Sequence, residues 1–352
     1  MKLLYLPNEN TEGDQYGPRS ALQKLKENGD IDELQIFSYF VVKRELGNWN
    51  KTLTEFLRVI ENAKPTTILI QHIGKNSFPE NLWKKIKNIY EGQNFPIFVY
   101  DERDVYGVFR KPLPQAVIKL TKKCDVISLV AKGKFAERFR RMGCRNVCYL
   151  PHVADKVRFG KPWEVNQPRN YDVIMIGNNT KSKIPFRSMP GSSQRERLAN
   201  LLSSKFGRRF ALFGQGWQEN KSNRGPLEFS LQEELMHTAW LRVGIDHFPN
   251  YEGYFSNSLP ITLISGTPYV VKYIPGMENF LVDGYHCRMF DTTEEAIEIT
   301  KELISGPRDK LIEMGQRGAE LAQNILNEDV RMERLINILK MHEETPFRKL
   351  SQ

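Results

Sequence analysis

The sequence predicts an α/β protein built from two Rossmann-like domains, each with a parallel sheet. Three observations support this prediction. Short apolar runs of strand length alternate with amphipathic helical runs, which is the pattern of a parallel sheet with crossover helices. A polar, proline-bearing segment at residues 155–170 interrupts the alternation and indicates a linker. The length of 352 residues also fits two domains better than one.

The first predicted domain spans residues 1–154. An apolar strand leads through a glycine-bearing loop to an amphipathic helix and a second strand, and this order makes one βαβ unit. The alternation then continues to Pro151 and His152. The predicted strands are residues 2–6, 34–39, 67–71, 96–100, 126–130 and 147–150, and the predicted helices are residues 19–28, 49–63, 78–90, 114–122 and 132–142.

The second predicted domain spans residues 171–327, and residues 328–352 form a terminal helix and tail. The alternation resumes after the linker with the same two periodicities. The predicted strands are residues 172–176, 210–213, 241–246 and 269–273, and the predicted helices are residues 194–206, 231–237, 261–264, 293–305, 308–325 and 329–342.

Composition limits the classes of partner. The net charge of +9 favours a polyanionic partner, which can be nucleic acid, an anionic membrane surface or a phosphorylated substrate; a solvated basic surface is the alternative. No apolar run approaches the roughly 20 residues of a membrane span, so we expect a cytoplasmic chain without a transmembrane segment. The 4 cysteines are expected to be reduced thiols, and no spacing of metal-ligating residues predicts a metal site.

Residues 252–281 hold the strongest local pattern. Ser256, Asn257 and Ser258 are N-cap types, and Pro260 suits the first helical turn. A helix N-terminus lined by such side chains binds anions, because unpaired N–H groups and the positive end of the dipole point outward together. The alternative is an ordinary αβ unit in which these residues cap the helix and bind no ligand. The chain has neither GxGxxG nor a Walker A motif, which argues against a standard dinucleotide or P-loop enzyme.

Four motifs occur in a familiar order: the strand DVIMIG, a helix opened by QRER, the strand FALFGQG and a Gly-Thr-Pro unit. This order resembles the carboxyl half of the GT-B glycosyltransferases over about residues 124–324. DVIMIG followed by GSSQRERLANLL is similar to the donor-binding turn of phage DNA glucosyltransferases that act on hydroxymethylated pyrimidines, and CgeB-like glycosyltransferases are also similar. The resemblance implies a GT-B fold, with two domains that face a cleft and a C-terminal helix that crosses back.

Two positions of one motif depart from the family pattern. The family usually has Arg, two further residues and then a Glu that grips the donor ribose, whereas this sequence has Ser258 and Ile261. The donor contact must therefore be made differently, and Glu252 or Glu278 could substitute.

Sugar transfer from a nucleotide sugar requires neutralisation of a leaving diphosphate, which falls to Arg, Lys and helix N-termini when no metal takes part. Arg195 is the leading candidate because it opens a helix beneath a strand end; pairing with Glu196 is its structural alternative. Glycines that follow two of the strands would let the nucleotide base of the donor approach the backbone; the alternative is that they only form turns. The predicted donor-binding residues are Gly177, Asn178, Lys181, Arg187, Arg195, Gly214, Gly216, Ser256, Asn257 and Ser258.

The acceptor hydroxyl must also lose a proton. YDERD is similar to the place where the phage enzymes carry a catalytic Asp, so Asp101 is the preferred base, with Asp104 and His72 as further candidates. The alternative is that this acidic cluster caps the next segment and pairs with Arg103.

A basic helix follows at residues 132–142 and predicts an acceptor surface. It would track a phosphate backbone without reading sequence, or would simply be a solvated helix face. A base in duplex DNA would have to leave the stack to react. The predicted acceptor-binding residues are Lys132, Lys134, Arg138, Arg141 and, through stacking, Tyr106.

These features favour a monomeric, metal-independent glycosyltransferase that needs no cofactor. The expected donor is a nucleotide-diphosphate sugar such as a UDP-sugar, and the expected acceptor is a hydroxymethylated pyrimidine in double-stranded DNA. The first alternative is the same chemistry on a lipid-linked or cell-surface glycan. The second is a binding protein for nucleotide sugars or nucleic acid without catalysis.

Overall fold

The computed structural model describes residues 1–107, 111–161, 163–164, 167–180 and 188–344, and these form two compact units. The first unit comprises Met1–Tyr106, Pro112–Leu150 and the C-terminal helix α12 (Glu328–Glu344). The second comprises Pro151–Asn327, together with Gly107 and Lys111. In this division, residues 151–154 of the first predicted domain and the described residues of the predicted linker belong to the second unit.

The first unit is a parallel sheet of 6 strands in the order β2-β1-β3-β4-β5-β6. Its inner strands are apolar on both faces, as expected for a sheet covered by helices on each side. The strands are β1 (Lys2–Leu6), β2 (Glu33–Ile36), β3 (Thr67–Gln71), β4 (Ile97–Glu102), β5 (Val126–Leu129) and β6 (Asn146–Tyr149), and the helices are α1 (Tyr16–Glu27), α2 (Tyr39–Leu46), α3 (Trp49–Ala63), α4 (Glu80–Ile89), α5 (Gln115–Thr121) and α6 (Gly133–Arg141).

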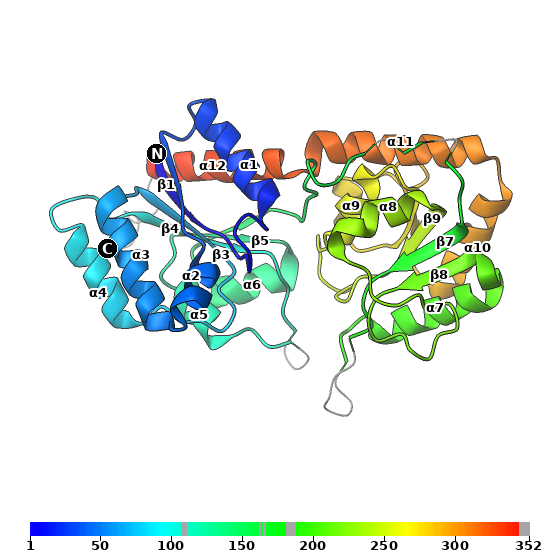
Figure 1. Ribbon diagram of the computed structural model, residues 1–352, viewed down its shortest axis with the longest axis horizontal. Helices are drawn as coiled ribbons and strands as arrows, with labels where there is room; N and C mark the ends of the chain where they lie inside the picture. The colour runs from blue at the N-terminus through cyan, green and yellow to red at the C-terminus, as the bar shows by residue number, and fades with distance from the viewer. Residues whose placement is uncertain (108–110, 162, 165–166, 181–187, 345–352) are drawn as a thin grey trace. The chain divides into compact units, whose positions relative to one another are not determined.

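Helix α12 follows the second unit in sequence but packs on the first. It lies beside α1 on one face of the sheet (Figure 1), and its Met332, Leu335, Ile336 and Leu339 are completely buried. These side chains join Val99 of β4 in one hydrophobic cluster. The predicted return of the C-terminal helix is therefore confirmed.

The second unit is a parallel sheet of 5 strands in the order β11-β10-β9-β7-β8. The chain runs from β7 to β8 on one side and then returns to β9 on the other, so the strand order reverses at β7. Ligands bind at such switch points beyond the carboxyl ends of the strands. The elements are β7 (Tyr171–Ile176), α7 (Ser192–Phe206), β8 (Phe210–Phe213), α8 (Gln232–His237), β9 (Ala239–Gly244), α9 (Ser258–Ile264), β10 (Tyr269–Lys272), β11 (Arg288–Phe290), α10 (Thr293–Ser305) and α11 (Arg308–Ile325).

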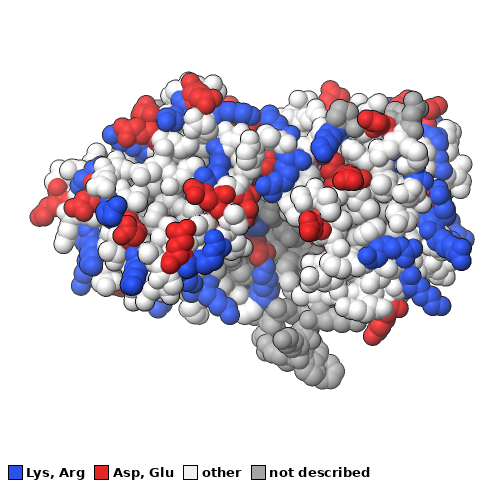
Figure 2. Space-filling view, in the orientation of Figure 1, with Lys and Arg blue, Asp and Glu red and all other residues white. Residues whose placement is uncertain are grey.

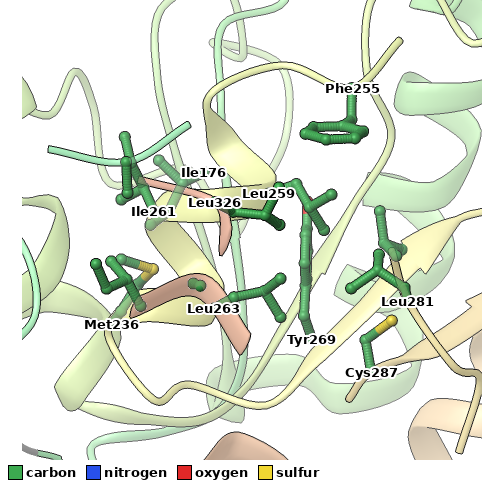
Figure 3. Close-up of a cluster of buried hydrophobic side chains, with 14 of the residues drawn as sticks. Ile176, Met236, Phe255, Leu259, Ile261, Leu263, Tyr269, Leu281, Cys287 and Leu326 are labelled. Carbon is green, nitrogen blue, oxygen red and sulfur yellow. The ribbon is translucent and has the colours of Figure 1, made fainter. Parts of the chain in front are cut away.

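One hydrophobic cluster joins α9 to this sheet (Figure 3). Ile261 belongs to it and is 2% exposed. The position where the family pattern has a glutamate is therefore filled here by an apolar core residue, which excludes it from direct contact with a polar ligand.

Two elements differ from the sequence prediction. The apolar run at residues 34–39 predicts one strand, but β2 ends at Ile36 and α2 begins at Tyr39. Strand β11, of 3 residues, is not among the predicted strands. Within the part of the chain that the structure describes, none of the helices is both long and apolar enough to cross a membrane.

Candidate functional site

A histidine and a buried glutamate meet at the carboxyl ends of β3 and β4. The Nδ1 atom of His72 lies 3.1 Å from Oε1 of Glu102. The side chain of His72 is 23% exposed and that of Glu102 is fully buried. Tyr100 and Tyr106 donate to Oε2 of Glu102 at 2.9 and 3.0 Å, and the N–H of Asp104 donates to Oε1 at 3.0 Å. A carboxylate bonded to Nδ1 orients the imidazole ring and favours the tautomer that carries its proton on that nitrogen.

The backbone of the loop holds His72 in place. The hydroxyl of Tyr39 donates to the carbonyls of Gln71 and His72 at 2.8 and 2.6 Å. The N–H of His72 donates to the carbonyl of Asp101 at 3.3 Å. These bonds tie the end of β3 to β4 and to the first residue of α2, so the imidazole sits on rigid elements.

Asp101 points to the opposite face of the sheet from Glu102, because successive side chains in a strand alternate. Its carboxylate accepts two hydrogen bonds from Arg331 of α12, at 2.9 and 2.6 Å, and one from Arg103 at 2.8 Å. The hydroxyl of Ser128 also donates to it. Asp101 is 1% exposed. Burial of the Asp101 carboxyl raises its pKa, but the positive charges of Arg331 and Arg103 lower the pKa by a larger amount. The pKa of Asp101 therefore lies well below its ordinary value. This environment suits a structural anchor better than the predicted catalytic base.

The other predicted residues of this unit have different surroundings. Asp104 accepts from the N–H of Val105 at 3.0 Å. Tyr106 is 2% exposed, and its ring stacks between His72 and Phe135, so it presents no open face to a base.

The basic residues of α6 are divided along the helix. Lys132, at the N-cap, stacks on Tyr149 with its Nζ 4.6 Å from the ring centre, and Lys134 is exposed in the first turn. Arg138 and Arg141 lie in the last turn, where cations interact favourably with the helix dipole; Arg141 pairs with Glu137 at 3.3 Å. The last turn leads to the amino end of β6, so only Lys132 and Lys134 lie toward the sheet edge that holds His72.

In the second unit, Arg195 of α7 joins the carboxyl ends of β7 and β9. Its Nη2 donates to the carbonyl of Asn178 at 3.0 Å and its Nη1 donates to that of Ile245. It is 5% exposed and forms no ion pair with the described residues. Burial lowers the pKa of Arg195, and Asp246 only partly offsets this. A buried cation held only by carbonyls is stabilised when an anion arrives.

A second buried arginine, Arg242 of β9, was not predicted as a site residue. It is 1% exposed, donates to the hydroxyls of Ser258 and Thr262 at 2.6 and 2.5 Å, and stacks on Tyr269. Burial lowers its pKa as well, and Asp246 partly offsets the shift. Among the described residues it also forms no ion pair with a carboxylate. The sequence signal was a charged residue inside the apolar strand AWLRVG.

Asp246 follows β9 and organises the loop before α9. Its oxygens accept the N–H of Ser256 at 2.9 Å and the hydroxyl of the same residue. Ser256 in turn accepts the N–H of Ser258 at 3.3 Å. Asn257 is exposed at the N-cap position and makes no side-chain cap. Two of the three predicted phosphate ligands thus bond to other residues of the site: Ser256 donates to Asp246, and Ser258 accepts from Arg242.

Unpaired polar atoms gather at this edge. Buried side-chain atoms without a hydrogen-bond partner are rare in folded proteins, so a group of them marks a place that a ligand or water completes. In the described part of the second unit, five such atoms belong to residues at or beneath the carboxyl ends of β7 and β9: Asn179 Oδ1, Ser192 Oγ, Arg195 Nε, Arg242 Nε and His247 Nδ1.

The loops after β7 and β8 touch through their backbones. A Cβ on Gly214 would lie 2.4 Å from the carbonyl oxygen of Gly177, and one on Gly216 would lie 2.1 Å from that of Asn179. Trp217 donates from its indole to the Gly177 carbonyl at 2.7 Å. The lack of a side chain at Gly214 and Gly216 therefore lets the loop after β7 pack closely against the loop after β8. Beside them is a pocket of about 280 Å³, lined by Asn179, Glu196, Asn200, Gly216, Trp217, Gln218, Glu219 and Asn220.

We predict that Gly216→Ala destabilises the second unit by about 3 kcal/mol, because it combines an unfavourable positive φ of 85° with overpacking against Asn179. Gly225 is the matched control, with a φ of 91° and nothing within 4 Å of the position that a methyl group would take. Gly225→Ala should cost only about 1 kcal/mol. Urea unfolding of both variants checks this, and equal losses would show that the loop contact adjusts freely.

His247, next to Asp246, was also not chosen from the sequence. Burial first, and then Arg195 and Lys111, lower its pKa from 6.5 to about 4. The folded state thus keeps His247 neutral while the unfolded chain takes up a proton, so this residue's contribution to stability is lost as pH falls from about 6.5 to 4. His247→Gln should remove about 1–3 kcal/mol of the pH dependence in that window, measured as the difference between wild-type and variant unfolding curves. Parallel curves would contradict the buried neutral state.

Two predicted donor-binding residues remain, together with the two glutamates that could substitute in the ribose contact. Lys181 and Arg187 lie outside the described residues. Glu252 is exposed, and Glu278 is exposed and accepts the N–H of Gly276 at 2.7 Å and the hydroxyl of Tyr273 at 3.1 Å. No group of three or more His, Cys, Asp or Glu side chains among the described residues is arranged to hold a metal ion.

No protein-family model and no curated protein sequence matches this chain. Solved structures match it in fold. HepE of Anabaena, in complex with UDP-glucose, superposes with a TM-score of 0.61 at 11% identity, over 97% of this chain and 100% of HepE. The lipopolysaccharide outer core galactosyltransferase WaaB gives 0.57 at 10%, over 97% of this chain and 99% of WaaB. TarM of S. aureus gives 0.55 at 13%, over 82% of this chain and 58% of TarM. The two parallel-sheet units therefore have the GT-B fold, as the sequence predicts.

Proposed function

We propose that the protein is a glycosyltransferase that moves a sugar from a nucleotide-diphosphate sugar to a hydroxyl acceptor. The observation that supports this most is the pair of buried arginines, Arg195 and Arg242, without an ion-paired carboxylate among the described residues at the switch point of the second sheet. A diphosphate is an anion that would neutralise such a pair of buried arginines. UDP-glucose is the donor to test first, because HepE, which is similar in fold, was solved with it.

The second unit would bind the donor. Arg195 lies at the ends of β7 and β9, where its positive charge would stabilise the charge that develops on the leaving diphosphate. Arg242 would add a second positive charge from beneath and hold Ser258 in place. The adjoining pocket of about 280 Å³ is close to the lower size of small-ligand pockets, roughly 300 Å³, and would take the nucleoside.

The first unit would supply the base, for which His72 is the best placed residue. The Nε2 of His72 would accept the acceptor hydroxyl proton while the acceptor oxygen bonds to the anomeric carbon and the bond from that carbon to the diphosphate oxygen breaks. The buried carboxylate of Glu102, 3.1 Å from Nδ1, would stabilise the imidazolium that forms. Asp101 remains a candidate from the sequence, but its two arginine partners and its burial favour His72 for this role.

The acceptor is proposed to be a hydroxymethylated pyrimidine in duplex DNA. The net charge of +9 supports this acceptor, as does the exposed Lys134 in the first turn of α6, the end of the helix that lies toward His72. On the face that Figure 2 shows, Lys and Arg side chains are interspersed with Asp and Glu on both units, so this face presents no continuous basic surface. A glycan acceptor is the second candidate, favoured by the similarity in fold to WaaB.

A thermal-shift screen against nucleotide sugars tests the donor proposal. A ligand that binds only the folded state at 100 times its Kd stabilises it by about 2.7 kcal/mol, which raises the melting temperature by several degrees. The stabilising donor is then supplied with hydroxymethylated duplex DNA or with glycan acceptors, and product is measured by mass spectrometry. No shift with any nucleotide sugar would contradict the donor proposal, and a shift without transfer or hydrolysis would indicate a non-catalytic binding protein.

Anisotropy of labelled duplex DNA over a salt series separates the acceptors. When a protein binds DNA phosphates, the logarithm of its association constant falls linearly with the logarithm of the salt concentration. Absence of DNA binding even at low salt would exclude the DNA acceptor and leave the glycan acceptor.

A further inference from the structure

A second group of unpaired donors lies at the amino end of the second sheet. Arg169 precedes β7, Trp240 is the second residue of β9, and Arg308 begins α11. Arg169 contacts two indoles, with its Cζ 4.5 Å from the ring centre of Trp163 and 5.5 Å from that of Trp240, and the two indoles meet edge to face with their ring centres 6.2 Å apart. Arg308 stacks on Trp240 at 4.6 Å. Two cations and two indoles thus form one cluster of cation–ring contacts, which we call the Arg–Trp stack.

The unsatisfied atoms of this stack are all donors. Trp163 Nε1, Arg169 Nε and Arg308 Nη1 are buried and have no hydrogen-bond partner among the described residues. Indole and guanidinium nitrogens cannot accept hydrogen bonds, so only an acceptor can complete them. At the carboxyl edge of the same sheet, by contrast, the unpaired atoms include oxygens and an imidazole nitrogen.

The charges of the stack are also not neutralised by ion pairs within the described residues. Arg169 is 9% exposed, and its Nη1 and Nη2 donate to the carbonyls of Gln167 and Glu164 at 3.0 and 2.7 Å. Burial lowers the pKa of Arg169, and the charge of Glu164 offsets part of that. Arg308 is half-buried and forms neither a hydrogen bond nor an ion pair with the described part of the chain.

We propose that the Arg–Trp stack is an oxyanion-binding site for a phosphate group, separate from the donor site. A tetrahedral oxyanion offers several acceptor oxygens to the three donors and a negative charge to the two guanidinium groups. Strands β7 and β9 each have 6 residues, which at about 3.3 Å per residue places the two edges of the sheet about 20 Å apart. One phosphate therefore cannot serve both edges.

Calorimetric titration of inorganic phosphate into the full chain, at constant ionic strength in chloride, tests this site. Trp163→Phe keeps the ring stack but removes one donor, and Arg308→Gln removes one cation. Each should weaken phosphate binding at least about tenfold, since a hydrogen bond to a charged group contributes at least that factor. Arg317→Gln is the matched control, because Arg317 also stacks on an aromatic ring, Tyr285 at 4.5 Å, and should leave phosphate affinity unchanged.

Arg195→Gln separates this site from the donor site, at which phosphate can also bind. The proposal predicts a component of phosphate binding that persists in Arg195→Gln and is lost in Trp163→Phe. It is overturned if Trp163→Phe and Arg308→Gln bind phosphate as the wild type does, or if Arg195→Gln abolishes all binding. A titration with phosphorylated nucleosides then shows whether the phosphate is free or esterified.

Discussion

Replacement of His72 by Asn is expected to lower the turnover rate by about 10²–10⁴-fold, the range attributed to a positioned general base. The affinity for the nucleotide sugar should not change, because His72 belongs to the first unit and the donor residues belong to the second. Single-turnover rates and donor Kd values, measured on the same preparations, check both halves of this expectation.

Glu102→Gln tests the partner of the imidazole. It keeps the size of the side chain but removes the charge that faces Nδ1 at 3.1 Å, so the rate should fall by at least about tenfold with unchanged donor affinity. His286→Asn is a control for replacing a histidine elsewhere; its Nδ1 accepts a loop N–H, from Val282 at 3.0 Å, and the rate should stay within about twofold. A His72→Asn variant with wild-type turnover would show that the base is another residue.

Asp101→Asn is expected to lower the free energy of unfolding by about 3–5 kcal/mol, because it removes the buried negative charge that accepts two hydrogen bonds from the buried Arg331. Arg331→Met should cost less than Asp101→Asn, because Arg103 still pairs with the buried Asp101 at 2.8 Å. The double variant should cost less than the sum, since the pair is then removed together. Guanidinium unfolding followed by circular dichroism measures all three.

Asp30→Asn is the matched control on the same helix contact. Asp30 pairs with Lys340 of α12 at 2.6 Å, but both side chains are 39% exposed, so the loss should be below about 1 kcal/mol. If Asp101→Asn instead keeps full stability and loses transfer, the catalytic role predicted from the sequence is restored and the structural role is contradicted.

The sequence predicts the fold well because it is encoded locally. Apolar runs, caps and glycines mark most strands and helices within a few residues of their observed ends. The failures have local causes too. Within residues 34–39 the boundary between β2 and α2 is marked only by Ser38, the N-cap of α2, and a single serine does not rule out a continuous strand. Strand β11 has only 3 residues, too few to show a period.

The site is harder to predict because its partners are distant in sequence. Asp101 and Glu102 are adjacent acidic residues at one strand end, and either could face the reaction. The choice depends on α12, whose Arg331 lies 230 residues away and covers the face of Asp101. Arg242 was missed for the same reason, since the hydroxyls that make its burial tolerable come from α9. The position of Arg195 at the end of β7 could be predicted because its helix directly follows the loop that ends this strand, and its role in donor binding stays a proposal.

Calorimetric titration of UDP-glucose, or of the donor found in the screen, into the wild type and Arg195→Gln tests the central claim most directly. The control is Arg197→Gln on the same helix, where Arg197 is exposed and pairs with Glu294 at 2.5 Å. We predict one saturable site in the wild type and in Arg197→Gln, and at least about tenfold weaker binding in Arg195→Gln. Equal affinity in all three proteins, or no saturable binding in the wild type, would contradict a diphosphate site at the end of β7.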